Sequence, residues 1–194
     1  RWELLVPSSH RTHCPFKGDA RYFTVDAGGR VADDACWQYP EPLEGCPPIA
    51  EHVAFHWDKM DAWFEEDEEI VVHPKDPYHR IDVRRSSRQV RVKVFDRVVA
   101  ETGQPSILFE TGLPPRYYVP AEDVRLQYLA PSETVTHCPY KGAASYWNVL
   151  VGERIAKDAV WSYERPLPEA LDVEGYRCFA GDEVALEVDG EPVT

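Results

Sequence analysis

Hydrophobic and polar residues alternate along much of the chain with a period of two, which is the pattern of half-buried β-strands. In residues 90–94 (VRVKV), valines alternate with basic side chains, and a turn near residue 96 leads into a second strand. Residues 106–112 (SILFETG) indicate a short apolar strand, and residues 114–120 (PPRYYVP) an extended aromatic segment. The 17 prolines also favour short strands and turns over long helices. The pattern therefore predicts a mainly β fold.

The chain also contains an internal repeat. Residues 1–25 (RWELLVPSSHRTHCPFKGDARYFTV) align without a gap with residues 125–149 (RLQYLAPSETVTHCPYKGAASYWNV), at an offset of 124. Of the first 43 aligned positions, 22 are identical, and the register continues as far as Phe55 and Phe179. Such self-similarity is typical of a tandem of one domain type.

The two copies of the repeat are not equally complete. Residues 81–124 carry the strands described above and form the front half of the second copy, whereas the first copy starts without one. We therefore expect residues 1–58 to be the back half of a first domain, residues 80–186 to be a complete second domain, and residues 187–194 to be a C-terminal tail. The missing front half further predicts that the native chain begins well before Arg1.

Residues 59–79 are expected to form a linker with a short helix. Asp58 can cap this helix, and Met60, Trp63 and Phe64 share a face by their i, i+3 and i+4 spacing. An acidic run then leads into HPKDPYH, which breaks regular structure. The apolar face of the helix is expected to pack between the domains, and the alternative is a helix that binds a partner.

Charge excludes some partners and leaves others open. The net charge of −13 disfavours duplex nucleic acid as a partner, because an acidic chain repels phosphate backbones. No apolar run approaches the roughly 18 residues of a membrane helix, so we expect no membrane partner. Residues 80–97 are an exception, with seven basic and two acidic residues. Their stripe is either a charged edge strand or an anion-facing surface, and it consists of Arg84, Arg85, Arg88, Arg91 and Lys93.

The cysteines and histidines do not indicate a cofactor. The five cysteines are widely spaced and form no C-x-x-C pair, which favours free thiols in a reducing cytoplasm. His52 and His56 have the i, i+4 spacing of a metal site on a helix, but their segment HVAFHW reads as a strand. Glycine-rich phosphate loops and the G-x-S-x-G motif are absent from the sequence. We therefore predict neither a metal nor an organic cofactor.

The repeated motif T-H-C-P-[FY]-K-G-x-A-x-Y-[FW] is the first candidate for chemistry. It occupies residues 12–23 and 136–147. Cys138 lies close to His137 and Lys141, and a neighbouring cation lowers a thiol pKa and raises the thiolate fraction. These three residues are the catalytic candidates, although Cys138 can equally be a small buried apolar residue.

Aromatic residues form the second candidate. Strand alternation places Tyr146 on the opposite face from Trp147, and it places Trp161 and Tyr163 on one face. These aromatic residues either fill the core alone, or some of them fill the core while the others line a pocket for a flat or cationic small molecule. The expected residues of this pocket are Tyr118, Cys138, Lys141, Tyr146, Trp161 and Tyr163, and in the first repeat Cys14, Lys17, Tyr22, Trp37 and Tyr39.

The segments THCPYKGAASYW, DAVWSYERPLPEA and FETGLPPRYYVPAEDV closely resemble a bacterial family known as domain of unknown function 427. The resemblance covers residues 81–186 and, in the first copy, residues 1–58. It implies tandem compact antiparallel domains of the β-tent type, similar to methionine sulfoxide reductase B and the ligand-binding domain of cereblon, but without the zinc cysteines. It implies no established activity. One family label suggests nucleotidyl transfer, for which the sequence offers neither a carboxylate pair nor a phosphate-cradling loop.

Three functions remain open on the sequence alone. The first is binding of a small molecule in a pocket lined by aromatic residues and lysine. The second is an enzyme, either thiol-dependent or nucleotidyltransferase-like, that uses the Cys-Pro-x-Lys-Gly motif. The third is a protein-interaction scaffold without catalysis. A homo-oligomer also remains open, since an incomplete domain can borrow surface from a neighbour.

Overall fold

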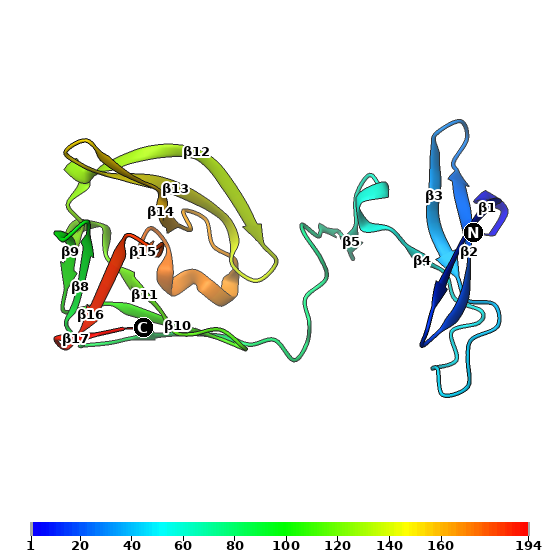
Figure 1. Cartoon of the computed structure of the whole chain (residues 1–194), viewed down its shortest axis with the longest axis horizontal. Helices are drawn as coiled ribbons and strands as arrows, with labels where there is room; N and C mark the ends of the chain where they lie inside the picture. Colours follow the sequence, from blue (N-terminus) through cyan, green and yellow to red (C-terminus); the bar gives the residue numbers. More distant parts are fainter. Residues whose placement is uncertain (1, 194) are drawn as a thin grey trace. The chain divides into compact units, whose positions relative to one another are not determined.

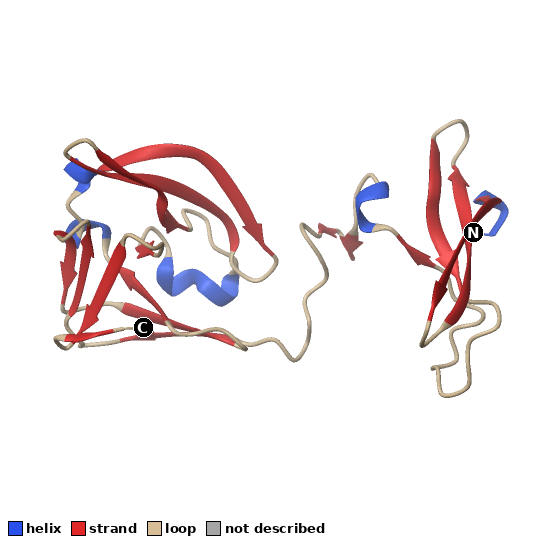
Figure 2. Cartoon of the chain, in the orientation of Figure 1, coloured by secondary structure: helices blue, strands red, loops and turns tan. Residues whose placement is uncertain are grey.

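The computed structural model describes residues 2–193, and the chain divides into two compact units, Arg1–Ile70 and Val71–Thr194 (Figure 1). Antiparallel strands dominate both units, and the helical segments that the structure describes are short 3₁₀ turns (Figure 2). The predicted mainly β fold is therefore confirmed. In the described residues no helix has the length and apolar character needed to cross a membrane.

The first unit is built on a four-stranded sheet with the order β1-β2-β3-β4, preceded by the 3₁₀ turn η1 (Trp2–Leu4). The strands are β1 (Leu5–Cys14), β2 (Gly18–Asp26), β3 (Val31–Gln38) and β4 (Ala54–Phe55). The buried apolar side chains described in this unit are all small, namely those of Ala20, Ala35 and Cys36. The larger aromatic side chains of the unit keep part of their surface exposed.

The predicted linker helix is wrong. Only the 3₁₀ turn η2 (Trp57–Lys59) forms there, and a two-stranded hairpin follows, with β5 (Phe64–Glu65) paired to β6 (Glu68–Glu69). The Trp63 ring stacks on Trp57 at 4.7 Å, and its Nε1–H donates to the Trp57 carbonyl at 3.0 Å. This aromatic stack and the turn at Glu66, where φ is +52°, replace the helix. Residues 73–79 contain no helix or strand, as expected.

The second unit contains a seven-stranded and a four-stranded antiparallel sheet. The larger sheet has the order β12-β13-β14-β15-β11-β10-β7, and the smaller has the order β17-β16-β8-β9. The larger sheet consists of β7 (Ile81–Arg85), β10 (Ser106–Glu110), β11 (Arg116–Val119), β12 (Leu129–Cys138), β13 (Gly142–Val151), β14 (Arg154–Ser162) and β15 (Arg177–Phe179). The smaller sheet consists of β8 (Val90–Val94), β9 (Arg97–Thr102), β16 (Val184–Val188) and β17 (Glu191–Pro192).

The C-terminal residues belong to the smaller sheet. The boundary expected after residue 186 falls inside β16, which pairs with β8 from Val184↔Val94 to Val188↔Val90. Val188 is buried in the core. The predicted alternation in residues 90–94 is present, because the valines of β8 are buried while Arg91 is exposed. Two connectors of this unit are the 3₁₀ turns η3 (Ala121–Asp123) and η4 (Leu126–Tyr128).

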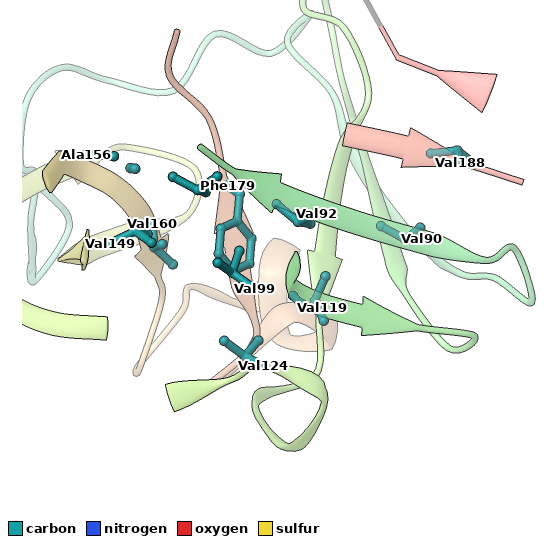
Figure 3. Close-up of a cluster of buried hydrophobic side chains, with 13 residues drawn as sticks. Val90, Val92, Val99, Val119, Val124, Val149, Ala156, Val160, Phe179 and Val188 are labelled. Atoms are coloured by element: carbon teal, nitrogen blue, oxygen red, sulfur yellow. The ribbon is translucent and has the colours of Figure 1, made fainter. Parts of the chain in front are cut away.

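Adjacent residues on the strands of the larger sheet point to opposite faces and so build two separate cores. One core packs against the smaller sheet (Figure 3) and draws its residues from β8, β9, β14 and their neighbours. The other core lies on the opposite face and includes Ala170 and Val173 from the 3₁₀ segment η5 (Pro168–Val173). Val119 and Val160 face the first core, whereas Tyr118 and Trp161, their sequence neighbours, face the second.

The basic stripe of the second unit is neutralised within the protein. Arg84 and Arg85 lie on β7, which is an edge strand. Arg91 and Lys93 lie on β8, an interior strand of the smaller sheet, so the edge-strand interpretation holds for only part of the stripe. Each of the five basic residues has a carboxylate within ion-pair distance. The pairs are Arg84–Asp82, Arg85–Asp172, Arg88–Asp189, Arg91–Glu101 and Lys93–Glu187. An anion-facing surface therefore has no support, since these charges already have partners.

Candidate functional site

A row of directly paired residues crosses the second face of the larger sheet. Tyr146 of β13 pairs with Trp161 of β14, Trp161 pairs with Cys178 of β15, and Cys178 pairs with Tyr118 of β11. Directly paired residues on neighbouring strands project to the same side, so the three aromatic rings come together although they are distant in sequence. The predicted separation of Tyr146 from Trp147 is confirmed, because Trp147 packs against the other core.

A cavity of about 380 Å³ opens over this row. Five of the residues expected from the sequence line it, namely Tyr118, Lys141, Tyr146, Trp161 and Tyr163. The front-half strands contribute further residues to its wall, among them Leu108, Glu110 and Arg116. Both halves of the second repeat therefore build the cavity.

The aromatic rings are held in place by hydrogen bonds and edge contacts. The Trp161 Nε1–H donates to the Tyr118 hydroxyl at 3.2 Å, and the two rings meet edge to face at 89°. The Tyr146 ring is tilted by 37° against Trp161, with 6.4 Å between the centroids. Its hydroxyl shares a hydrogen bond of 3.0 Å with the Thr136 hydroxyl. Burial raises the pKa of Tyr118 and of Tyr163, so both phenols stay neutral.

Lys141 is paired with a carboxylate at the side of the cavity. Its Nζ donates to Glu110 Oε2 at 2.5 Å, and His79 Nε2 lies 3.0 Å from the other oxygen of Glu110. Both members of the lysine pair are nearly buried, with 11% and 9% of their side chains exposed. Burial raises the pKa of Glu110, but the hydrogen bonds from Lys141 and His79 outweigh it, so this pKa lies below its ordinary value. The His79 ring also stacks on Tyr140 at 4.3 Å.

The Lys-Gly turn of the motif fixes the backbone of Lys141. Gly142 has φ of +97°, and a Cβ there would lie 3.2 Å from the Arg165 carbonyl oxygen. The Leu167 N–H donates to the Lys141 carbonyl at 3.1 Å, which ties the turn to the segment before η5. Glycine is required for both the positive φ and the close approach. Backbone contacts of the turn therefore position Lys141 at the cavity.

Three charged residues of the cavity wall were not expected from the sequence, namely Arg116, Glu110 and Asp158. Arg116 lies with its guanidinium 5.8 Å from the centre of the Trp161 ring. Strand periodicity could have found it, because Arg116 and Tyr118 are two residues apart on β11. Glu110 stands in the same relation to Leu108 on β10. The sequence alone did not show that β11 would pair with β15 and bring its neighbour β10 to the cavity.

The thiol candidates are not gathered in the cavity. Cys138 pairs with Gly142 at the start of the turn and is not among the residues that line the cavity. His137 is exposed, and as the neighbour of Cys138 on a strand it projects from the opposite face. Cys178 lies beneath the aromatic row, where burial raises the pKa of its thiol to about 12. The predicted cluster of Cys138, His137 and Lys141 is therefore not formed as one site.

The expected site residues of the first repeat are arranged differently. Lys17 is exposed, and its Nζ lies 5.7 Å from the centre of the Tyr39 ring. Tyr22 stacks with Trp37 at 6.4 Å. The pKa of the Cys14 thiol is lowered, chiefly by a hydrogen bond from the Phe16 backbone. Two cavities described in this unit, of about 560 and 470 Å³, are lined by other residues. The five residues therefore do not share a described cavity.

Metal-ligating side chains do not gather in residues 2–193. No group of three or more His, Cys, Asp or Glu residues has the arrangement of a metal site there. Ala54 and Phe55, which lie between the two histidines of the HVAFHW segment, form strand β4. The strand interpretation holds for these two residues only, because His52, Val53 and His56 lie outside the strand and Trp57 begins η2.

Comparison with known proteins gives one result. A protein-family model matches residues 1–66 and 82–190, and its description is "Domain of unknown function (DUF427)". The first matched segment lies within the first unit and the second lies within the second unit. No curated protein matches the chain.

Proposed function

The chain belongs to the family of domain of unknown function 427, whose description assigns no activity, and we propose from the cavity itself that the second unit binds a small molecule. The ligand occupies the cavity formed by β11, β13 and β14, against the aromatic row. Tyr146 and Trp161 contact its flat face, and Lys141 lies at its edge. Binding of this kind requires no covalent step.

One observation carries the proposal. Five residues chosen from the sequence for their ability to hold a flat molecule, Tyr118, Lys141, Tyr146, Trp161 and Tyr163, line a single cavity. The volume of about 380 Å³ falls at the lower end of the roughly 300–1,000 Å³ of small-molecule sites. An aromatic wall with a few fixed polar groups is also the usual composition of such sites.

The thiol-enzyme alternative has less support, because the motif cysteine whose pKa is lowered, Cys14, lines neither of the cavities described in the first unit. Cys138 is absent from the cavity wall, and the raised pKa of Cys178 keeps its thiol protonated at neutral pH. No observation in the described residues favours nucleotidyl transfer over binding. The scaffold alternative predicts no small-molecule binding, so the same experiment tests it.

The test is calorimetric titration of the full chain with four flat probes: benzoate, benzamide, indole-3-carboxylate and indole-3-carboxamide. At least one probe is expected to bind, and Tyr146→Leu is expected to weaken it about tenfold through the loss of ring contact. The matched control is Tyr22→Leu, the equivalent substitution in the first repeat, whose tyrosine makes the same hydrogen bond to a threonine. The control is expected to leave binding unchanged.

Two outcomes contradict the proposal. If none of the four probes gives a binding isotherm, the cavity is not a site for flat molecules. If Tyr146→Leu and Tyr22→Leu have the same effect, the probe binds elsewhere on the chain.

A further inference from the structure

The cavity wall offers more free hydrogen-bond donors than acceptors. Arg116 has no ion pair and no hydrogen bond from its side chain among the described residues, so its guanidinium N–H groups are available. The Tyr118 hydroxyl accepts from Trp161, and the structure records no acceptor for its own hydrogen within residues 2–193. Lys141 uses one of its three N–H groups on Glu110. A ligand that fits these groups is rich in acceptors.

The two carboxylates of the wall are already committed. Glu110 accepts from both Lys141 and His79. One oxygen of Asp158 accepts from the Thr134 hydroxyl at 2.9 Å, and the other is buried without a donor, so it presents no surface to a ligand. A ligand therefore meets few free acceptors.

Two charged residues of the cavity wall, Arg116 and Asp158, have no ion pair within residues 2–193, and of these two only Arg116 presents hydrogen-bond donors to a ligand. The positive charge of Lys141 is offset by Glu110 at 2.5 Å, whereas no carboxylate lies within ion-pair distance of Arg116 in the described part of the chain. Its guanidinium is planar and presents paired N–H groups, which match a carboxylate better than a single donor does. An anion bound there would pair with the Arg116 guanidinium.

The rings next to Arg116 define the shape of the ligand. The guanidinium lies 5.8 Å from the centre of Trp161, and the Tyr146 ring adjoins Trp161 at 6.4 Å. A flat ring resting against Trp161 and Tyr146 would carry a substituent within reach of Arg116. The site thus combines a planar apolar wall with a cationic end.

We propose, on the basis of the function proposed above, that this cavity selects planar aromatic or heteroaromatic carboxylates and that Arg116 binds the carboxylate. Ligand recognition then has two separable parts. The aromatic row provides affinity for the ring, and Arg116 provides the preference for an anion over its neutral counterpart.

The first test compares matched probes on the native chain by calorimetry. Benzoate is expected to bind about ten- to a hundredfold more tightly than benzamide, and indole-3-carboxylate more tightly than indole-3-carboxamide by a similar factor, because a hydrogen bond to a charged group is stronger than one to a neutral group. Cyclohexanecarboxylate keeps the charge but is not planar, and it is expected to bind more weakly than benzoate.

The second test identifies the residue that is responsible for the preference for carboxylates over amides. Arg116→Gln is expected to abolish the preference, so that benzoate and benzamide bind with similar affinity. The matched control is Arg97→Gln on β9, an exposed arginine of the smaller sheet, which is expected to keep the preference. Circular dichroism of both variants establishes that each is folded, and the probe comparison on the native chain does not depend on either variant.

The outcomes separate this inference from the proposed function. Equal binding of carboxylates and amides overturns the inference and leaves the proposed function standing. A preference for carboxylates that survives Arg116→Gln also overturns the inference, because the anion is then bound by another group. Failure of all the probes overturns both.

Discussion

At the scale of single residues, the Lys141–Glu110 pair has the largest energetic consequence. Both side chains are nearly buried, and His79 supplies a second donor to the carboxylate. A buried pair of this kind gains little net stability by itself, but removal of one partner leaves the other charge without compensation. The pair therefore fixes the position of Lys141 relative to β10.

Replacement of the Glu110 carboxylate is expected to destabilise the folded chain. Glu110→Gln is expected to lower the free energy of unfolding by about 3 kcal/mol at pH 7, because Lys141 is then buried without a counter-charge. Urea denaturation at several pH values measures this change. The control is Glu101→Gln, which breaks the half-exposed pair with Arg91 and is expected to cost about 0.5 kcal/mol.

The pH dependence of this pair has a defined sign. The pKa of Glu110 is lowered in the folded chain, so its stabilisation is fully present above the unfolded pKa of about 4.3 and is lost as the pH falls through the folded value. The difference between the native chain and Glu110→Gln should therefore shrink below about pH 4.3. A difference that stays constant down to pH 2 would contradict the ion pair.

Single residues also show how far the sequence could predict the site. Tyr146, Trp161 and Tyr163 were found because strand alternation is local and their motif is repeated. Arg116 and Glu110 were missed because their roles depend on the long-range pairing of β11 with β15, which brings β11 and its neighbour β10 to the aromatic row. Cys138 is close to Lys141 in sequence, but unlike Lys141 it is not among the residues that line the cavity.

At the scale of elements, the Lys-Gly turn is the feature that both repeats share most closely. Gly18 and Gly142 have φ of +96° and +97°, and in each case a Cβ would lie 3.2 Å from a carbonyl oxygen of the segment that follows the third strand of the repeat. The N–H two residues beyond that carbonyl donates to the carbonyl of the motif lysine in both units. The dipeptide is therefore preserved between the copies for a structural reason.

Substitution of Gly142 tests whether the Lys-Gly turn requires glycine for a structural reason. Gly142→Ala is expected to destabilise the second unit by about 2–3 kcal/mol, since it combines an unfavourable φ with a close contact to backbone. Gly152→Ala is the control, because that glycine has φ of +60° and a Cβ added to it would have no neighbouring atom within 4 Å. The control is expected to cost about 1 kcal/mol.

Chemical denaturation of the two variants compares two causes of destabilisation, the positive φ and the close contact with the Arg165 carbonyl oxygen. A cost at Gly142 that clearly exceeds the cost at Gly152 supports the role of the Arg165 contact. Equal costs would show that positive φ alone accounts for the glycine, and the close approach would then have no energetic weight.

The local sequence pattern predicted the strands better than it predicted the structure of the linker segment that follows Asp58. The alternation in β8 and the aromatic segment of β11 were identified from short-range periodicity. The helix expected after Asp58 rested on three apolar residues over five positions, a pattern too short to exclude other structures. Trp63 instead stacks on Trp57, and Phe64 enters a hairpin.

At the scale of the whole molecule, two units share one strand arrangement but differ in their cores. β1 to β4 and β12 to β15 have the same order, with register shifts at equivalent positions. In the second unit, Val160 packs into a core with the valines of β8 and β9. Its equivalent in the first unit, Cys36, is buried together with only two alanines among the described apolar side chains of that unit. Self-comparison of the sequence predicted the shared strands, but it could not give the difference in packing.

Hydrogen exchange on the full chain should reveal this difference. The pairs Phe23↔Cys36 and Trp147↔Val160 are equivalent in register, so their amides form matched probes. The amides of β13 and β14 are expected to exchange at least about tenfold more slowly than those of β2 and β3, because even one additional fully buried valine contributes about 1.5 kcal/mol. Equal protection of the matched amides would contradict this expectation. It would mean that the pairing of the strands, which the repeats share, rather than the core beneath them, determines how readily each sheet opens.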